Sequence, residues 1–419
     1  MDKLIISGPA KLSGTVRIAR AKNAYLPILA AVLLSDKPIH LKNIPELQDI
    51  KTMIKLLSNL GVTIKKEGDI TTFDASTLNS HEATYDIVKT MRASIFVLGP
   101  LLARRKAARV SLPGGCAIGT RPIDLHLTNL EKLGCEINVH SGYVDAKVDK
   151  MKATHITLAF PSVGATENLM MAAVFSDGVT TIENSALEPE IDDLAHFLNA
   201  MGANVKGIGT RTIVVTGVKE LKEVTYEAIG DRIEAATYLM AALATGSDIE
   251  ILGVNPRHLD FVTEVLQQMG AKIVTGENSI KVFKSELKGC LIDTAPFPGF
   301  PTDAQAQMIA LCTQVKGASV ITEHIFENRF MHVPELVRLG ADITLKGKSA
   351  FIQGGEKLTA APVMCTDLRA SAALIIAALA TEGDTEIQRV YHLDRGYERL
   401  VDKFSALGAK IKRVPGNPT

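Results

Sequence analysis

The chain has 419 residues, of which 46% are hydrophobic and 22% are charged. This length and composition predict two folded domains and exclude a disordered chain. Lysine plus arginine and aspartate plus glutamate both number 46. The overall charge therefore gives no indication of binding to nucleic acid or to a membrane surface, and an anionic ligand would need a local cluster of cations.

The five cysteines are scattered at positions 116, 135, 290, 312 and 365, and this odd number does not indicate a disulfide framework. The first residues carry no signal-peptide pattern, and no apolar run approaches the length of a membrane span. These features predict a cytoplasmic protein without membrane insertion. The sequence forms no H-E-x-x-H, P-loop or dinucleotide-loop motif, so neither a metal nor a cofactor is predicted.

Six similar units follow one another along the chain. A Leu-Gly or Met-Gly pair followed by a short β-branched segment recurs with its glycine at positions 61, 134, 202, 270, 340 and 408. Each glycine is expected to end a helix and precede a strand. A second helix is expected to begin about half a unit earlier, near residues 22, 90, 162, 231, 302 and 366. This period predicts repeated βαβ-type units rather than a Rossmann or TIM fold.

The first residues are expected to complete the sixth unit, which is short. Ile6-Ser7-Gly8 matches Ile352-Gln353-Gly354 and Val215-Thr216-Gly217, and no such strand follows Ile411. We therefore predict one domain of residues 22–229 and a second of residues 1–21 plus 230–419. The two chain crossings would form a hinge, and hinged enzymes commonly bind substrate in the cleft.

A glycine-rich loop from Leu112 to Pro122 contains Cys116, with Arg121 five residues further on. Pro122 and Gly134 predict the first position and the end of a following helix. A helix N-terminus and a permanent positive charge both favour the thiolate of Cys116. The alternative is a small apolar residue in a tight turn.

Polar residues recur at equivalent places in the six units. Three arginines stand 13 residues before their glycine, namely Arg121, Arg257 and Arg395. Helix N-termini already attract anions, and added arginines make anion sites. The alternative is that the polar residues are helix caps and surface charges. Those at or near the helix starts are Lys22, Asn23, Arg92, Ser162, Asp231, Arg232, Glu234, Asp303, Asp367 and Arg369.

With these motifs in order, the chain resembles the UDP-N-acetylglucosamine 1-carboxyvinyltransferases, enolpyruvyl transferases of the EPSP synthase superfamily. The resemblance covers essentially the whole length and implies two inside-out α/β barrels, each of three repeated units. The motifs that carry it are Ala21-Lys22-Asn23-Ala24, Lys89-Thr90-Met91-Arg92-Ala93-Ser94, the Cys116 loop, Ser162-Val163-Gly164-Ala165-Thr166, Pro301-Thr302-Asp303, Glu327-Asn328-Arg329-Phe330, Thr366-Asp367-Leu368-Arg369 and Asp394-Arg395-Gly396-Tyr397. The chain departs from the usual family pattern at Ala19-Arg20, Phe96 and Ala236.

The resemblance implies transfer of the enolpyruvyl group of phosphoenolpyruvate to the 3-hydroxyl of UDP-N-acetylglucosamine, the first committed step of peptidoglycan precursor synthesis. It implies Cys116 as proton donor and site of a covalent adduct, including that of fosfomycin, and Asp303 as the base. Lys22, Arg121 and Arg395 would hold phosphoenolpyruvate. Contacts to the UDP-sugar would come from Asn23, Arg92, Arg121, Pro122, Ile123, Asp124, Leu125, Ser162, Val163, Gly164 and Ile325. Supporting polar residues would be Arg329, Asp367 and Arg369.

These residue types suit the chemistry, because two anionic substrates need fixed cations and the hydroxyl proton needs an acceptor. Two alternatives remain open at this point. A shikimate-3-phosphate enolpyruvyl transferase shares the fold, but the cysteine loop and the segment from Arg121 to Leu125 argue against it. A regulatory paralogue that binds UDP-sugar without catalysis is disfavoured by the presence of Lys22, Cys116, Asp303 and Arg395. No protein partner is predicted.

Overall fold

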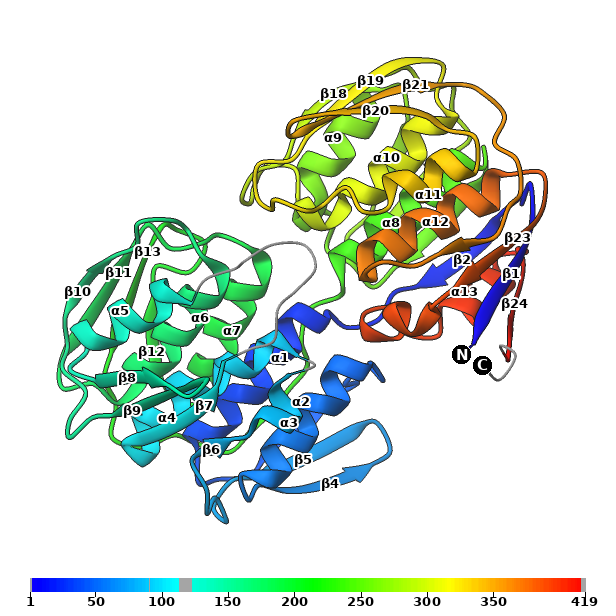
Figure 1. Ribbon diagram of the computed structural model, residues 1–419. Coiled ribbons are helices and arrows are strands. Elements are labelled where there is room, and N and C mark those ends of the chain that lie inside the picture. The colour runs from blue at the N-terminus through cyan, green and yellow to red at the C-terminus, as the bar shows by residue number, and fades with distance from the viewer. Residues whose placement is uncertain (1, 90, 113–122, 416–419) are drawn as a thin grey trace. The chain divides into compact units, whose positions relative to one another are not determined.

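The computed structural model describes residues 2–89, 91–112 and 123–415, which form two compact units (Figure 1). The middle unit contains the described residues of 20–229. The terminal unit contains those of 1–19 and 230–419. Each unit has three four-stranded sheets and its own hydrophobic core.

In the middle unit, each sheet pairs its first two strands in parallel and its remaining neighbours antiparallel. The first sheet is β14 (Val224–Tyr226), β3 (Ile39–Lys42), β5 (Ile70–Asp74) and β4 (Thr63–Glu67). The second is β6 (Glu82–Ala83), β7 (Ala107–Ser111), β9 (Tyr143–Lys147) and β8 (Glu136–His140). The third is β10 (His155–Thr157), β11 (Val179–Glu183), β13 (Thr212–Thr216) and β12 (Asn204–Lys206).

The terminal unit repeats this pattern, with β2 parallel to β15, β18 to β19 and β22 to β23. One sheet is β2 (Ser13–Arg17), β15 (Asp248–Leu252), β17 (Ser279–Phe283) and β16 (Lys272–Thr275). The next is β18 (Leu291–Asp293), β19 (Gly317–Thr322), β21 (Ser349–Gly354) and β20 (Asp342–Lys346). The last is β22 (Val363–Met364), β23 (Gly383–Gln388), β1 (Lys3–Gly8) and β24 (Lys410–Val414).

The helices of the terminal unit explain why the barrel is inside out. Helices α8 (Arg232–Ala244), α10 (Gln305–Gln314) and α12 (Leu368–Ala380) pack against one another and are buried along almost their whole length. Helices that are apolar all round belong in a core, and here the sheets lie outside them. The other helical segments of this unit are η4 (Pro256–Leu259), α9 (Asp260–Gln268), η5 (Thr302–Ala304), α11 (Val333–Arg338), η6 (Val390–Arg395) and α13 (Leu400–Ala406).

The middle unit is built in the same way. Its apolar helices α1 (Lys22–Ala31), α4 (Leu98–Arg105) and α6 (Val163–Ala172) are mostly buried, and α6 contacts both of the others. The remaining helical segments are η1 (Val32–Leu34), α2 (Gln48–Asn59), α3 (Tyr85–Val88), η2 (Arg92–Val97), α5 (Asp124–Lys132), η3 (Ala173–Phe175) and α7 (Pro189–Ala200). The predicted fold class, two inside-out α/β barrels each of three repeated units, is confirmed.

The six predicted glycines all lie just beyond a helix in the left-handed region, with φ between +93° and +111°. They follow α2, α5, α7, α9, α11 and α13, and each precedes a strand. A glycine adopts this conformation without the steric cost that other residues incur. The repeat inferred from the sequence is therefore confirmed.

Strand β1 completes the last sheet, as the sequence predicted. It lies between β23 and β24 and pairs antiparallel with both. It occupies the position that β21 and β13 hold in their own sheets. The next strand, β2, then joins the sheet of β15, just as β14 joins the first sheet of the middle unit. Each unit is thereby a closed ring of three repeats.

No helix within residues 2–89, 91–112 and 123–415 is both long enough and apolar enough to cross a membrane.

Candidate active site

Lys22 begins helix α1 and is 9% exposed. Its ammonium Nζ lies 3.3 Å from the Oδ2 atom of Asp49, in the first turn of α2. Asn23 follows it and is half-buried. Asp49 thus places a counter-charge beside the ammonium group of Lys22, whose positive charge suits the predicted role of binding an anion.

Three segments predicted to contact the UDP-sugar meet in the middle unit around His126. His126 lies in the first turn of α5, two residues after Asp124. A Cβ atom placed on Gly164 would lie 3.2 Å from Cε1 of His126 and 3.3 Å from Cε1 of Phe96 in η2. The starts of α5 and α6 are therefore in close contact with each other and with Phe96 near the end of η2. These helix starts carry Ile123, Asp124 and Leu125, then Ser162, Val163 and Gly164, and the charge of Arg92, the first residue of η2, acts on His126.

His126 was not predicted as a site residue, and its environment keeps it neutral. Burial, and then the charge of Arg92, lowers the pKa of His126 to about 4. Its Nδ1 atom lies 3.1 Å from Nδ2 of Asn168, and that amide nitrogen is also 3.0 Å from the backbone oxygen of Ile95. Since the amide nitrogen donates, Nδ1 must accept and the ring proton is assigned to Nε2. Asn168 also accepts from the backbone N–H of Gly99 at 2.7 Å, so one buried side chain joins η2, α4, α5 and α6.

Three of the predicted site residues, Cys116, Arg121 and Pro122, lie outside the described residues. The helix expected to begin at Pro122 instead has Ile123 as its N-cap and Asp124 as its first residue. Ile123 has a non-helical conformation, with φ −98° and ψ 8°. The predicted first position of this helix is therefore wrong by two residues, whereas its end before Gly134 is correct.

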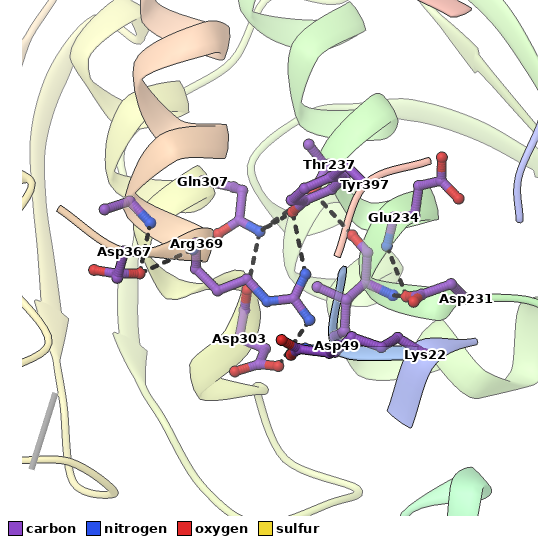
Figure 2. Close-up of polar contacts among 12 residues, drawn as sticks. Lys22, Asp49, Asp231, Glu234, Thr237, Asp303, Gln307, Asp367, Arg369 and Tyr397 are labelled. Atoms are coloured by element: carbon purple, nitrogen blue, oxygen red, sulfur yellow. Dashed lines mark hydrogen bonds and ion pairs between the residues drawn. The ribbon is translucent and has the colours of Figure 1, made fainter. Parts of the chain in front are cut away.

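In the terminal unit, Asp303 is held by two arginines, Arg329 and Arg369, of which Figure 2 labels Arg369. Arg329 Nη2 lies 2.8 Å from Oδ1, and Arg369 Nη2 lies 2.9 Å from Oδ2. Both arginines are 4% exposed, whereas the side chain of Asp303 is 28% exposed. Burial alone would lower the pKa of Arg369, but the charge of Asp303 raises it above its ordinary value. The structure thus groups one predicted base with two of its predicted supporting residues.

Asp367 and Ser162 act as helix caps. Oδ1 of Asp367 accepts from the backbone N–H groups of Arg369 and Ala370, at 2.9 and 3.0 Å. The hydroxyl of Ser162 accepts from the N–H of Ala165 at 3.3 Å. The capping interpretation therefore holds for both, and Asp367 fixes the start of the helix that carries Arg369.

Glu323 was missed by the sequence analysis although it shapes the surroundings of two predicted residues. Its Oε1 accepts from the backbone N–H groups of Ile325 and Phe326, at 2.8 and 3.2 Å. Its Oε2 accepts from the hydroxyl of Thr302 at 2.8 Å. The buried carboxylate therefore ties the backbone at Ile325 to the residue preceding Asp303.

Arg395 ends η6 and is half-buried. The neighbouring Asp394 receives two hydrogen bonds from Arg413 in β24, at 2.7 and 2.8 Å. Tyr397, two residues after Arg395, is buried and contacts the side chains of Thr237, Gln307 and Arg369. The sequence contained a signal for the contacts around Tyr397, because Thr237 and Gln307 are polar residues within apolar helical runs.

The middle unit thus offers Lys22 and Arg92 as cations for anionic groups, and the terminal unit offers in Asp303 a carboxylate that can accept a proton. Within the described part of the chain, no group of three or more His, Cys, Asp or Glu side chains could hold a metal ion. The cations and the carboxylate can support proton transfer and electrostatic stabilisation.

Comparison with known proteins identifies the family. Residues 6–404 match the sequence profile of EPSP synthase (3-phosphoshikimate 1-carboxyvinyltransferase). The UDP-N-acetylglucosamine 1-carboxyvinyltransferase of Acinetobacter baylyi is 52% identical over 417 residues, covering 99% of this chain and 100% of that protein. The enzyme of that name from Trichlorobacter lovleyi is 54% identical over 416 residues, covering 99% of each.

Solved structures agree with this assignment. The enolpyruvyl transferase NikO from Streptomyces tendae superposes with a TM-score of 0.89 at 25% identity, covering 99% of each chain. An EPSP synthase from Acinetobacter baumannii gives 0.78 at 18% identity, covering 99% of this chain and 100% of that one, which shows the fold alone. The chain belongs to the EPSP synthase family and, within it, to the UDP-N-acetylglucosamine 1-carboxyvinyltransferases.

Proposed function

We propose that the protein transfers the enolpyruvyl group of phosphoenolpyruvate to the 3-hydroxyl of UDP-N-acetylglucosamine with release of phosphate, in peptidoglycan precursor synthesis. The observation that carries this proposal is the 52–54% identity to enzymes of that name over the full length. The two substrates are its only proposed partners. The free state of the four described cysteines fits the predicted cytoplasmic location, which stays part of the proposal.

The proposed roles follow the chemistry of addition and elimination. Cys116 gives a proton to the methylene carbon of phosphoenolpyruvate, and the neighbouring carbon becomes electron-deficient. The sugar hydroxyl oxygen bonds to that carbon while Asp303 takes the hydroxyl proton. The methyl group of the adduct then returns a proton to the Cys116 thiolate, phosphate leaves with its bonding electrons, and the vinyl ether forms.

The cations have separate proposed tasks. Lys22, Arg121 and Arg395 hold the phosphate and carboxylate of phosphoenolpyruvate, and the buried charge of Lys22 supports this role. The contact of the starts of α5 and α6 with Phe96 of η2, and the effect of the Arg92 charge on His126, support the proposed UDP-sugar contacts of Arg92, Ile123 and Gly164. We also propose the domain division of the sequence analysis, 22–229 and 1–21 plus 230–419.

One assay tests the proposal. Phosphate release from phosphoenolpyruvate is measured with UDP-N-acetylglucosamine and, separately, with shikimate 3-phosphate. We expect turnover with the first acceptor only. Turnover with shikimate 3-phosphate alone would favour the other enolpyruvyl transferase. Binding of UDP-N-acetylglucosamine without turnover would favour a regulatory paralogue.

A further inference from the structure

The hydroxyl of Tyr397 is a meeting point of three helices in the terminal unit (Figure 2). It lies 2.9 Å from Oγ1 of Thr237 in α8, 3.3 Å from Nε2 of Gln307 in α10 and 3.3 Å from Nη1 of Arg369 in α12. Tyr397 is 4% exposed, so water does not compete for these contacts.

The directions of these hydrogen bonds follow from the donors present. Arginine and the amide nitrogen can only donate, so the Tyr397 oxygen accepts from Arg369 and from Gln307. The two hydrogens of Gln307 Nε2 are shared among Tyr397, Oγ1 of Thr237 at 3.2 Å and the backbone oxygen of Asp303 at 2.9 Å. The hydroxyl proton of Tyr397 is then available for Thr237. The Thr237 hydroxyl in turn donates to the backbone oxygen of Ile233 at 2.8 Å. The chain of donors runs one way, from the guanidinium to the backbone of α8.

Both side chains that donate to Tyr397 also contact Asp303. Arg369 Nη2 lies 2.9 Å from its carboxylate oxygen Oδ2, and Gln307 Nε2 lies 2.9 Å from its backbone oxygen. The Tyr397 hydroxyl is therefore connected to Asp303 by two routes. One runs through Arg369 to the side-chain carboxylate, and the other runs through Gln307 to the backbone oxygen. The charged groups around this network are Arg369, Arg329, Asp303 and Asp231.

Tyr397 is also tied to the segment that carries Arg395. The backbone N–H groups of Gly396 and Tyr397 both donate to the oxygen of Leu393, at 3.0 and 2.9 Å. A Cβ atom on Gly396 would lie 2.6 Å from Cδ2 of Leu368, so this segment packs closely against the start of α12. One side chain thus links the surroundings of Arg395 to those of Asp303.

We propose that Tyr397 is a positioning residue for the transfer reaction. Its hydroxyl fixes the guanidinium of Arg369 and, through Gln307, the backbone of Asp303. The Asp303 carboxylate is thereby held in its reactive orientation. The inference rests on the proposed function. Tyr397 makes no contact with the reacting atoms in this account, and it acts through Arg369 and Gln307.

The closing experiment compares Tyr397→Phe with two variants that the structure supplies. Phenylalanine keeps the ring, whose centroid lies 5.6 Å from Cζ of Arg369, and removes only the hydroxyl. Tyr238 is the matched control, because it is fully buried next to Thr237 and its hydroxyl has no partner among the described residues. Thr237→Val removes the acceptor of the Tyr397 proton and one acceptor of Gln307 Nε2, but it leaves the hydrogen bonds from Arg369 to Tyr397 and from Gln307 to the backbone oxygen of Asp303.

Steady-state kinetics and thermal unfolding are measured on all three full-length variants. For Tyr397→Phe we expect kcat to fall roughly tenfold or more, the size of one hydrogen bond to a charged group, with the KM for UDP-N-acetylglucosamine unchanged. We expect Tyr238→Phe to keep kcat within about twofold of wild type. Thr237→Val is expected to lower the unfolding temperature while keeping kcat near wild type.

Two results would overturn the inference: a Tyr397→Phe enzyme with kcat within about twofold of wild type, or an equal loss of kcat in Thr237→Val. If Tyr397→Phe does not fold, Gln307→Met replaces it, because this variant removes the other link to Asp303. The expected result is the same: a lower kcat with an unchanged KM for UDP-N-acetylglucosamine. Absence of turnover in the wild-type protein would instead contradict the proposed function.

Discussion

At Asp303, two buried guanidinium groups meet one partly exposed carboxylate. Sequence reasoning placed Asp303, Arg329 and Arg369 in the site by resemblance, but it did not pair them. The three residues are separated by 26 and 40 positions, and no local pattern specifies which side chains meet across that distance. Their pairing depends on the packing of η5 and α12, which only the fold determines.

Replacing Asp303 by asparagine tests the base directly. The amide keeps the shape but cannot take up the hydroxyl proton, so we expect kcat to fall by roughly 10²-fold or more. It also leaves two buried arginines without their counterion, so the free energy of unfolding should fall as well. Phosphate release at saturating substrate and thermal unfolding provide the two measurements. Asp293→Asn is the control, because its carboxylate is 73% exposed and pairs with His324. An Asp303→Asn enzyme with kcat within a few-fold of wild type would refute the role.

Cysteine labelling tests the assignment of Cys116 against a competitor that the structure identifies. A hydrogen bond from Cys312 at 3.7 Å lowers the pKa of Cys290, whereas burial raises the pKa of Cys135 and of Cys365 to about 12. The hydrogen bond to Cys290, followed by burial, raises the pKa of Cys312.

We therefore expect iodoacetamide at neutral pH to modify Cys116 and Cys290, because the thiolate is the reactive form. Fosfomycin should modify Cys116 alone, since its phosphonate needs the cation cluster, and UDP-N-acetylglucosamine should accelerate that reaction. Peptide mass spectrometry identifies the sites, and Cys116→Ser should lose the fosfomycin adduct and most turnover. Fosfomycin adducts spread over several cysteines would contradict the loop assignment.

Glu167 in α6 gives a pH-dependent prediction. It is fully buried, and its carboxyl oxygens have no hydrogen-bond partner within the described residues. Burial, and then the charges of Glu190 and Glu188, raises its pKa well above the ordinary 4.5. The folded protein thus holds a proton that the unfolded chain releases above pH 4.5, so this residue lowers stability progressively as pH rises toward the folded-state pKa.

Glu167→Gln should therefore match wild type in unfolding temperature near pH 4 and exceed it at pH 8. Thermal unfolding across that range provides the measurement. Glu136→Gln is the control, because that side chain is 74% exposed and should shift little at either pH. Equal effects of Glu167→Gln at both pH values would show that the carboxyl is ionised throughout.

At the scale of elements, the repeat was predictable because it depends on local rules. Gly61, Gly134 and their four counterparts end helices, and apolar periodicity marks the elements around them. The contact between α5, α6 and η2 was not predictable, because it depends on His126 and Asn168 lying inside the core. A buried histidine in an apolar run is indistinguishable from an exposed one until its neighbours are known.

Gly164 tests that contact. An alanine there would push its Cβ against the rings of His126 and Phe96, at 3.2 and 3.3 Å, and shift the start of α5 and the end of η2 by a few tenths of an ångström. We expect Gly164→Ala to weaken the binding of UDP-N-acetylglucosamine severalfold. The unfolding temperature should change little, because alanine also favours the helix by about 0.5–1 kcal/mol. Calorimetry provides the affinity. Unchanged affinity would remove these three segments from the proposed sugar site.

At the scale of the whole molecule, the first strand, β1, lies within the sheet that also contains the last strand, β24. Gly8 allows this closure, since a Cβ atom there would meet the backbone oxygens of Thr381 and Ala378 at the end of α12. Gly217 and Gly354 stand at equivalent places and would likewise meet backbone oxygens. The matching triplets in the sequence therefore reflect a shared close approach of strand to helix.

Gly8→Ala should consequently lower the local stability of the sheet that contains β1, rather than the stability of the whole molecule. Overpacking against backbone costs about 1–3 kcal/mol, and the strain must fall on β1 and its neighbours β23 and β24. Gly14→Ala is the control for backbone strain alone, because Gly14 has a φ of +93°, which Gly8 does not share, and has nothing within 4 Å of its Cβ position.

Hydrogen exchange measures the difference. We expect faster exchange in β23 and β24 in Gly8→Ala, normal exchange there in Gly14→Ala, and unchanged exchange in the sheets of the middle unit in both. Uniform acceleration over the whole chain would mean that the N-terminal strand stabilises the molecule globally, because the two rings then unfold as one. Acceleration confined to the last sheet would show that each ring of three repeats is stabilised separately by the strand that closes it.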